Sequence, residues 1–149
     1  MRIAICTDHA GIEFSRIVRA ELERVGHECI DLGSNGQDPQ DDYPDFALDV
    51  AQCVSRGEAD AGVCICGTGI GMSIAANKVK GVRAAVCWDE FTTRVSRTHN
   101  NANVLCLGAR VLDAAAGAHL AALWTTVEFE GGRHARRVGK ITRFESAEC

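Results

Sequence analysis

Short apolar runs alternate with amphipathic segments of helical length along this chain of 149 residues. The run 2–7 is typical of a β-strand, and in 13–25 apolar side chains recur every three or four positions, as on one face of a helix. The run 61–66 is apolar at nearly every position, which indicates a strand buried on both faces of a parallel sheet. These patterns predict strands at 2–7, 28–32, 61–66, 83–87 and 103–107, and helices at 13–25, 43–56, 70–79, 90–97 and 113–124.

The βαβαβ order with short connections predicts an α/β fold. We expect a Rossmann-like, doubly wound parallel sheet of about five strands, with helices on both faces in a three-layer arrangement. A chain of this length buries about 70% of its unfolded surface around a single core, so we expect one domain, 1–149. After Gly131-Gly132 the alternation stops and a basic amphipathic segment, 133–145, follows. No strand is left for it to pair with, so we expect a C-terminal helix that packs on its own domain or on a partner subunit.

Composition excludes some classes of protein and leaves others open. The formal net charge of −4 argues against a nucleic-acid binder that relies on a basic surface, but a small anion needs only a few local donors. The chain has no run of 18 or more apolar residues, and we expect neither a membrane segment nor a signal peptide. Five of the eight cysteines lie in or beside strand-like runs, where a free thiol acts as a small hydrophobic side chain. We therefore expect a cytoplasmic protein with reduced cysteines.

Reactive side chains are concentrated at the carboxyl ends of the predicted strands. Ligands of open α/β sheets bind at this edge. The segments there are Thr7-Asp8-His9, Cys66-Gly67-Thr68-Gly69-Ile70-Gly71, Trp88-Asp89 and Gly108-Ala109-Arg110. Their shared position favours a functional site more strongly than any one of these segments does.

The segment Cys66–Gly71 places three glycines between a buried strand and a helix. Such a loop can direct successive N–H groups at one point, and the helix N-terminus behind it strengthens an anion site. The same field favours a thiolate at Cys66, which suits removal of a proton beside a carbonyl while the amides hold the enediolate oxygen. Similar turns occur in many nucleotide-binding proteins, although this one is neither G-x-G-x-x-G nor a Walker A motif. Cys64 and Cys66 form C-x-C without a second Cys/His pair, which argues against zinc.

Each of the remaining polar positions can also be explained by a purely structural role. Asp8 is a favoured N-cap for the helix that follows it. His99 and Asn100 lie between a helix and a strand, where polar loop residues are common, and a histidine becomes significant only beside a site that needs a titrating group. Arg133 and Arg137 are four residues apart and would share a helix face able to bind a phosphate, but charged runs of this kind are often solvated surface.

Taken together, these segments resemble type B ribose-5-phosphate isomerases, a family that also contains the subunits of galactose-6-phosphate isomerase. The resemblance extends over nearly the whole chain. It is carried by Asp8-His9-Ala10-Gly11, Asp42-Tyr43-Pro44, Cys66–Gly71, Ile74-Ala75-Ala76-Asn77-Lys78, Gly81-Val82-Arg83-Ala84, Ser96-Arg97, His99-Asn100, Asn103-Val104-Leu105, Gly108-Ala109-Arg110 and Glu130-Gly131-Gly132-Arg133-His134. So many segments in the same order are specific for this family.

The resemblance implies a role for each matching residue. Cys66 would be the base that transfers the proton, Thr68 a hydroxyl that assists it, and His99 the group that helps to open the furanose ring. Some family members use a glutamate in the helix after the loop, but 67–76 contains no carboxylate here. The implied catalytic residues are Cys66, Thr68, His99 and Asp8. The implied substrate-binding residues are Asp8, His9, Gly67, Thr68, Gly69, Ile70, Gly71, Asn100, Arg110, Arg133 and Arg137.

The family also implies a homodimer whose active sites combine two subunits, and a reaction without metal or cofactor. We therefore expect an aldose–ketose isomerase that interconverts ribose 5-phosphate and ribulose 5-phosphate through a cis-enediolate. Its partner would be a small sugar phosphate, with neither nucleic acid nor membrane involved. The substrate could also be allose or galactose 6-phosphate, or a tetrose phosphate, with the same chemistry. His99 favours a substrate that forms a ring, but it does not set the number of carbons. A non-catalytic phosphosugar-binding protein is the alternative from another class; it would need the arginines but not Cys66 with His99.

Overall fold

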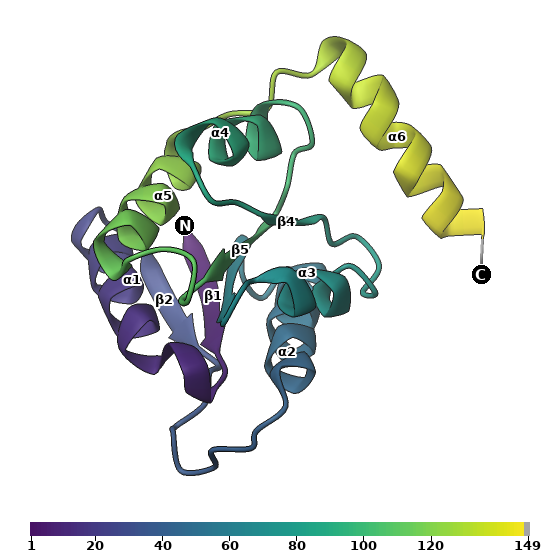
Figure 1. Cartoon of the computed structure of the whole chain (residues 1–149). Coiled ribbons are helices and arrows are strands. Elements are labelled where there is room, and N and C mark those ends of the chain that lie inside the picture. Colours follow the sequence, from purple (N-terminus) through teal and green to yellow (C-terminus); the bar gives the residue numbers. More distant parts are fainter. Residues whose placement is uncertain (148–149) are drawn as a thin grey trace.

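The computed structural model describes residues 1–147 and contains a five-stranded parallel sheet in the order β2-β1-β3-β5-β4 (Figure 1). The doubly wound parallel sheet predicted from the sequence is therefore confirmed. The strands are β1 (Arg2–Thr7), β2 (Glu28–Asp31), β3 (Ala61–Cys66), β4 (Ala84–Val86) and β5 (Val104–Gly108). The helices are α1 (Ile12–Arg24), α2 (Tyr43–Ser55), α3 (Ile70–Ala76), α4 (Glu90–Thr98), α5 (Ala114–Thr126) and α6 (Gly132–Ala147), with a short 3₁₀ helix, η1 (His9–Gly11), before α1.

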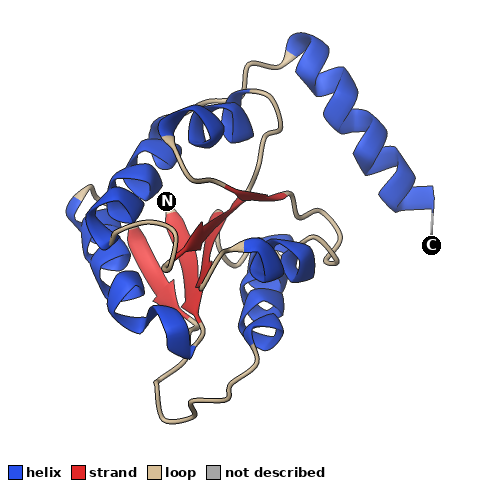
Figure 2. Cartoon of the chain, viewed as in Figure 1, coloured by secondary structure: helices blue, strands red, loops and turns tan. Residues whose placement is uncertain are grey.

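Helices cover both faces of the sheet and form the predicted three layers (Figure 2). On one face α1 and α5 pack against each other around a core that includes Phe14 and Trp124. They approach closely because Gly117 of α5 has no side chain, and a Cβ there would overlap the ring of Phe14. On the other face, α2 and α3 bury Val50 and Met72 completely against the sheet.

The three central strands, β1, β3 and β5, are buried on both faces, as their apolar runs predict. Cys6, Cys64 and Cys106 are in-register neighbours on these strands and are fully buried. They pack as small apolar side chains, which confirms the interpretation of the strand cysteines. A hydrogen bond with Cys64, together with burial, raises the pKa of the Cys6 thiol well above its usual value. This thiol therefore stays protonated.

Local capping sets where several elements begin and end. Asp89 accepts the N–H of Thr92 at 2.6 Å, and the two residues form a capping box at the start of α4. Asp113 accepts the N–H of Ala116 at 2.7 Å at the start of α5. Gly26 takes a left-handed conformation with φ +94° just after α1, as glycine commonly does where a helix ends.

Some predicted boundaries differ from the structure. Helix α3 ends at Ala76 rather than at 79, because the carboxamide of Asn77 accepts the N–H of Ala84 at 2.8 Å and donates to its carbonyl at 2.9 Å. These bonds tie the end of α3 to the start of β4. Strand β4 is shorter than the predicted 83–87 because, as an edge strand, it pairs with β5 alone. The sequence pattern does not predict η1, which forms because Asp8 caps it.

Helix α6 is the predicted C-terminal helix, and it lies apart from the three layers (Figure 1). Only His134 of this helix is buried, while Ile141 and Phe144 are 58% and 67% exposed. Glu145 links α6 to the domain by accepting the N–H of Gly81 at 2.9 Å. The helix thus carries apolar side chains that the rest of residues 1–147 leaves uncovered. Among residues 1–147, no helix combines the length and the apolar character that crossing a membrane requires.

Candidate active site

The order of the strands reverses at β1, because β2 lies on one side of it and β3 on the other. In open α/β sheets, ligands bind at such a switch point, outside the carboxyl ends of the strands. Asp8 and His9 directly follow β1, and Cys66 ends β3. Since β1 and β3 are neighbours, the topology brings these predicted site residues to the same edge of the sheet.

The loop Cys66–Gly71, called the thiol loop below, folds back on its own sulfur atom. Cys66 is 5% exposed, and its Sγ accepts the N–H of Gly69 at 3.2 Å. Gly69 has φ +80°, and a Cβ there would lie 3.1 Å from the backbone of Leu107. The hydroxyl of Thr68 accepts the N–H of Ile70 at 3.3 Å. The fold thus gathers a sulfur, a hydroxyl and backbone N–H donors at the start of α3.

The turn that follows β5 is fastened to the thiol loop. The N–H of Ala109 donates to the carbonyl of Cys66 at 2.8 Å, and that of Arg110 to the carbonyl of Gly67 at 2.9 Å. Gly108 allows this approach, because a Cβ there would lie 2.8 Å from the backbone of the thiol loop. The side chain of Arg110 lies over Gly67, where a Cβ would meet it at 3.3 Å. A guanidinium is therefore held beside the sulfur-bearing loop.

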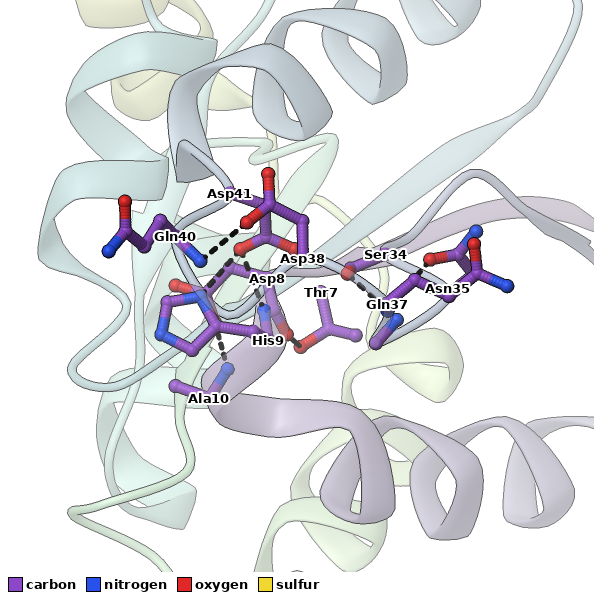
Figure 3. Close-up of polar contacts among 11 residues, drawn as sticks. Thr7, Asp8, His9, Ala10, Ser34, Asn35, Gln37, Asp38, Gln40 and Asp41 are labelled. Atoms are coloured by element: carbon purple, nitrogen blue, oxygen red, sulfur yellow. Dashed lines mark hydrogen bonds and ion pairs between the residues drawn. The ribbon is translucent and has the colours of Figure 1, made fainter.

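Asp8 and His9, which lie side by side (Figure 3), both interact electrostatically with this guanidinium. Asp8 is 7% exposed and accepts the N–H of Ala10 at 3.0 Å. It therefore caps the short helix that follows it, as the structural explanation of this residue predicts. Burial raises the pKa of the Asp8 carboxyl, although that hydrogen bond and the charges of His9 and Arg110 oppose the shift. His9 Nδ1 lies 2.6 Å from Oδ1 of Asp41, and this hydrogen bond raises the pKa of His9.

A second group of predicted residues surrounds another cavity. His99, Asn100, His134 and Arg137 line a space of about 210 Å³. The rings of His99 and His134 are stacked, with centroids 4.1 Å apart and planes 5° from parallel. Nε of Arg133 donates to Nε2 of His134 at 3.3 Å, so that nitrogen carries no proton. Burial, followed by the charges of His99 and Arg133, lowers the pKa of His134.

Two histidines of this group and a neighbouring glutamate are the three side chains best placed to hold a metal ion among residues 1–147. The ligand atoms of His99, Glu130 and His134 lie within 4.8 Å of one another. However, stacked parallel rings direct their nitrogen lone pairs side by side rather than toward one point. The neighbouring arginines also disfavour a cation electrostatically. The arrangement suits an anion better than a metal.

The two groups lie at opposite edges of the sheet. Helix α4 leads from the carboxyl end of β4 to the amino end of β5, so His99, at its end, lies near the amino edge. The N–H of Gly62, at the start of β3, donates to the carbonyl of Asn103 at 2.9 Å and fixes this part of the chain. Cys66 ends the same strand, which spans about 16 Å. One chain therefore does not bring His99 to Cys66.

We refer to these two sets by their positions. The carboxyl-edge group contains Asp8, His9, Cys66, Gly67, Thr68, Gly69, Ile70, Gly71 and Arg110. The amino-edge group contains His99, Asn100, Arg133 and Arg137, with His134 beside them.

Both groups fall within the part of the chain that matches a known protein family. The model of the Ribose/Galactose Isomerase family matches residues 3–141. The chain belongs to this family. Membership confirms the resemblance drawn from the sequence segments, and with it the class of enzyme.

Solved structures of ribose/galactose isomerases agree with the fold. The chain is similar to ribose-5-phosphate isomerase B of Clostridium thermocellum, with 48% identity, a TM-score of 0.96 and all of both chains covered. It is also similar to ribose-5-phosphate isomerase B of Mycoplasma genitalium, solved with bound ribulose-5-phosphate, at 44% identity and a TM-score of 0.93, over 97% of this chain and 96% of that one. The D-erythrulose-4-phosphate isomerase of Pectobacterium atrosepticum is 38% identical, over 99% of this chain and 97% of that one.

Three residues near the two groups are missing from the set of site residues predicted from the sequence. The ring of Tyr43 lies against Gly71, where a Cβ would come within 2.5 Å of it. Asp41 holds His9, and His134 stacks on His99. Tyr43 and His134 occur in segments that resemble the isomerase family, which is a signal for them. Asp41 lies in a polar loop, and nothing in the local sequence marks it.

The conformation of the thiol loop predicts that Gly69→Ala lowers isomerase activity. Gly69 and Gly81 share a left-handed conformation, with φ +80° and +82°, so alanine at either position should cost about 1–2 kcal/mol of stability. Only at Gly69 does the Cβ also meet backbone, that of Leu107. The loop must then shift, and kcat/KM should fall at least about 10-fold. Gly81→Ala is the matched control, and thermal unfolding and steady-state kinetics should be measured for both variants. Equal kcat/KM values in Gly69→Ala and Gly81→Ala would contradict the prediction.

Proposed function

We propose that this protein interconverts ribose 5-phosphate and ribulose 5-phosphate through a cis-enediolate. The observation that carries the proposal is the environment of Cys66, a nearly buried sulfur that accepts an N–H from its own glycine-rich loop. Arg110 lies beside that loop and supplies a positive charge for a phosphorylated substrate. The relative from Mycoplasma genitalium, solved with ribulose-5-phosphate, supports the choice of sugar.

In this proposal Cys66 moves one proton between two neighbouring carbons. As a thiolate, it removes the proton from C2 of the open-chain aldose, and the electron pair moves to the carbonyl oxygen at C1 to form the enediolate. The N–H groups of the thiol loop hold this oxygen, because preorganised donors stabilise developing negative charge. Cys66 then returns the proton to C1. The hydroxyl of Thr68 assists proton exchange between the two oxygens, which leaves a carbonyl at C2.

Ring opening and phosphate binding use the other predicted residues. His99, as an imidazolium, donates a proton to the ring oxygen of the furanose as the bond between that oxygen and C1 breaks. The C1 hydroxyl gives up its proton to water and becomes the carbonyl, while Asp8 and Asn100 hold the remaining sugar hydroxyls. Arg133 and Arg137 bind the phosphate as a pair on one face of α6. In this scheme Arg110 and His9 bind the phosphate from the carboxyl edge. The proposal therefore requires both groups in one site.

A homodimer satisfies this requirement. In a two-fold dimer the same surfaces of both chains meet, so the amino-edge group of each chain can face the carboxyl-edge group of the other. Helix α6 supports such an assembly, since Ile141 and Phe144 are exposed on it and a groove of about 640 Å³ runs along it. A second copy of the chain would cover these apolar side chains and bring Arg133 and Arg137 to the thiol loop.

The length of the sugar is the point on which the alternatives differ. A tetrose 4-phosphate, as in the Pectobacterium relative, lacks the free hydroxyl needed to close a furanose ring. The proposed ring-opening role of His99 therefore favours a pentose, or a hexose 6-phosphate such as allose or galactose 6-phosphate. A non-catalytic phosphosugar-binding protein would have no use for the Cys66 environment.

The reaction sets few further requirements. Isomerisation is redox-neutral and needs no redox cofactor, and each step of the proposed route is assigned to a side chain or a backbone N–H. It does need Cys66 reduced. A reducing cytoplasm provides this condition, and we propose that location for the protein.

A substrate comparison tests the proposed function directly. We expect turnover of ribose 5-phosphate, with kcat/KM at least about 10-fold above the values for allose 6-phosphate, galactose 6-phosphate and erythrulose 4-phosphate, because a misfit of one carbon displaces the reacting atoms. Steady-state assays with the purified protein give the ratio. A preference for another sugar would correct the substrate, and no turnover of any of them would remove the isomerase proposal.

Replacement of Cys66 by alanine tests the base. Loss of the general base should lower kcat by about 10²–10⁴-fold and leave KM for ribose 5-phosphate nearly unchanged. Cys53→Ala is a matched control, since Cys53 lies on α2, away from the thiol loop, and is 8% exposed. Near wild-type turnover in Cys66→Ala would mean that another group moves the proton.

Mixed dimers test whether two chains share each site. Cys66→Ala and Arg137→Ala chains should each be nearly inactive alone. After unfolding and refolding together, half of the dimers would be mixed, and each mixed dimer would contain one intact site, so about a quarter of the wild-type activity should return. If the activity of the mixture stayed at the level of the separate variants, each site would belong to a single chain.

A further inference from the structure

Asp41 holds one side of the His9 ring. Its Oδ1 accepts the backbone N–H of His9 at 3.0 Å and lies 2.6 Å from Nδ1 of the same residue (Figure 3). The side chain of Asp41 is 9% exposed, whereas that of His9 is 38% exposed. The carboxylate therefore lies behind the ring, and the ring keeps an accessible side that can meet a ligand.

The loop that carries Asp41 is ordered by its own side chains. Three polar side chains each accept the backbone N–H of the residue two positions further on, at 2.8–3.1 Å. The acceptors are Ser34, Asn35 and Asp38 (Figure 3). Such turns fix a loop locally without packing it into the core. These turns therefore fix the loop between β2 and α2, and with it the position of Asp41 next to His9.

The hydrogen bond decides which nitrogen of His9 carries a proton. An ionised carboxylate only accepts, so Nδ1 must donate to Asp41, and Nε2 remains as the nitrogen for a ligand. Burial alone would raise the pKa of Asp41, but hydrogen bonds from Ser34 and His9 outweigh it and hold the pKa below its usual value. Asp41 therefore stays ionised at neutral pH.

The charged groups around His9 favour its protonated form. The hydrogen bond with Asp41 is the largest contribution and raises the pKa of His9, and the negative charge of Asp8 acts in the same direction. Partial burial and the positive charge of Arg110 oppose the shift without cancelling it. An unperturbed histidine is mostly neutral above pH 6.5, and this shift keeps the imidazolium to a higher pH than that.

We propose that Asp41 is a positioning residue that accepts Nδ1–H of His9 and keeps the ring protonated, so that Nε2–H of the imidazolium points to and binds the substrate phosphate. The inference rests on the proposed function, in which His9 and Arg110 bind that phosphate. A charge-assisted hydrogen bond from an imidazolium to a phosphate is about twice as strong as a neutral one. Asp41 acts through His9 and does not touch the sugar.

Titration of His9 by NMR tests the pair without turnover. In Asp41→Asn the amide oxygen can still accept from Nδ1, so the neutral ring should still carry its proton on Nδ1 while the pKa of His9 falls. In Asp41→Ala both this preference of the neutral ring and the raised pKa should be lost. Asp38→Asn is the matched control, since Asp38 lies in the same exposed loop, and neither property should change. An unaltered His9 titration in Asp41→Asn would overturn the proposal.

Kinetics at two pH values test the role in phosphate binding. His9 should be protonated in every variant at pH 5.5, but at pH 8 it should keep its charge best when Asp41 is present. Asp41→Asn should therefore raise KM for ribose 5-phosphate about 5-fold at pH 8 and leave KM unchanged at pH 5.5. The value of kcat should stay within about 2-fold at both pH values, since Asp41 does not touch the reacting carbons. An equal effect on KM at both pH values would indicate a structural role and overturn the proposal.

A double-mutant cycle separates action through His9 from other effects. In a His9→Gln background, Asp41→Asn should have no further effect on KM, whereas an additive effect would contradict the proposed route. If the unaltered chain did not turn over ribose 5-phosphate, the proposed function would fall. The dependence of the His9 titration on added inorganic phosphate, compared between wild type and Asp41→Asn, would still decide whether Asp41 supports anion binding.

Discussion

Parallel pairing of β1, β3 and β5 is the constraint on which the rest of this molecule depends. Because the three strands run in the same direction, the residues that follow them meet at one edge, and Asp8, Cys66 and Arg110 become neighbours although they are far apart in sequence. The same constraint sends each connecting helix back to the opposite edge. His99 therefore lies there. In the proposed function neither set is complete on its own, and assembly of two chains would be part of the chemistry.

Position, rather than residue type, distinguishes Cys66 from the other cysteines of the sheet. Cys64 is two residues earlier on β3, fully buried in a row with Cys6 and Cys106. Its hydrogen bond with Cys106, together with burial, raises the pKa of this thiol well above the usual value and outweighs the opposing hydrogen bond with Cys6. Cys66 lies where the strand ends and meets a backbone N–H instead of another thiol. One strand thus carries both an inert thiol and a candidate base, separated by a single residue.

The sequence predicts the fold and the carboxyl-edge group well, because both follow from local patterns. Apolar runs indicate buried strands, and the glycines of the thiol loop lie between a strand and a helix. What it cannot predict depends on contacts between distant segments. The stack of His134 on His99 depends on how α6 leaves the domain. The contact of Asp41 with His9 depends on the path of a loop with no periodic pattern. Helix α3 ends early because Asn77 forms hydrogen bonds with β4, which lies outside the local sequence pattern.

The two backbone hydrogen bonds that fasten the turn after β5 to the thiol loop have a further consequence. They hold the backbone of Arg110 at a fixed distance from that of Cys66. In the proposed function, this fixes the base relative to one of the side chains that bind the phosphate. Arg133 and Arg137 lie on a helix that stands apart from the sheet and is not fastened to the thiol loop in this way. A sugar of another length would then have to leave Arg110 and keep its phosphate on these two arginines.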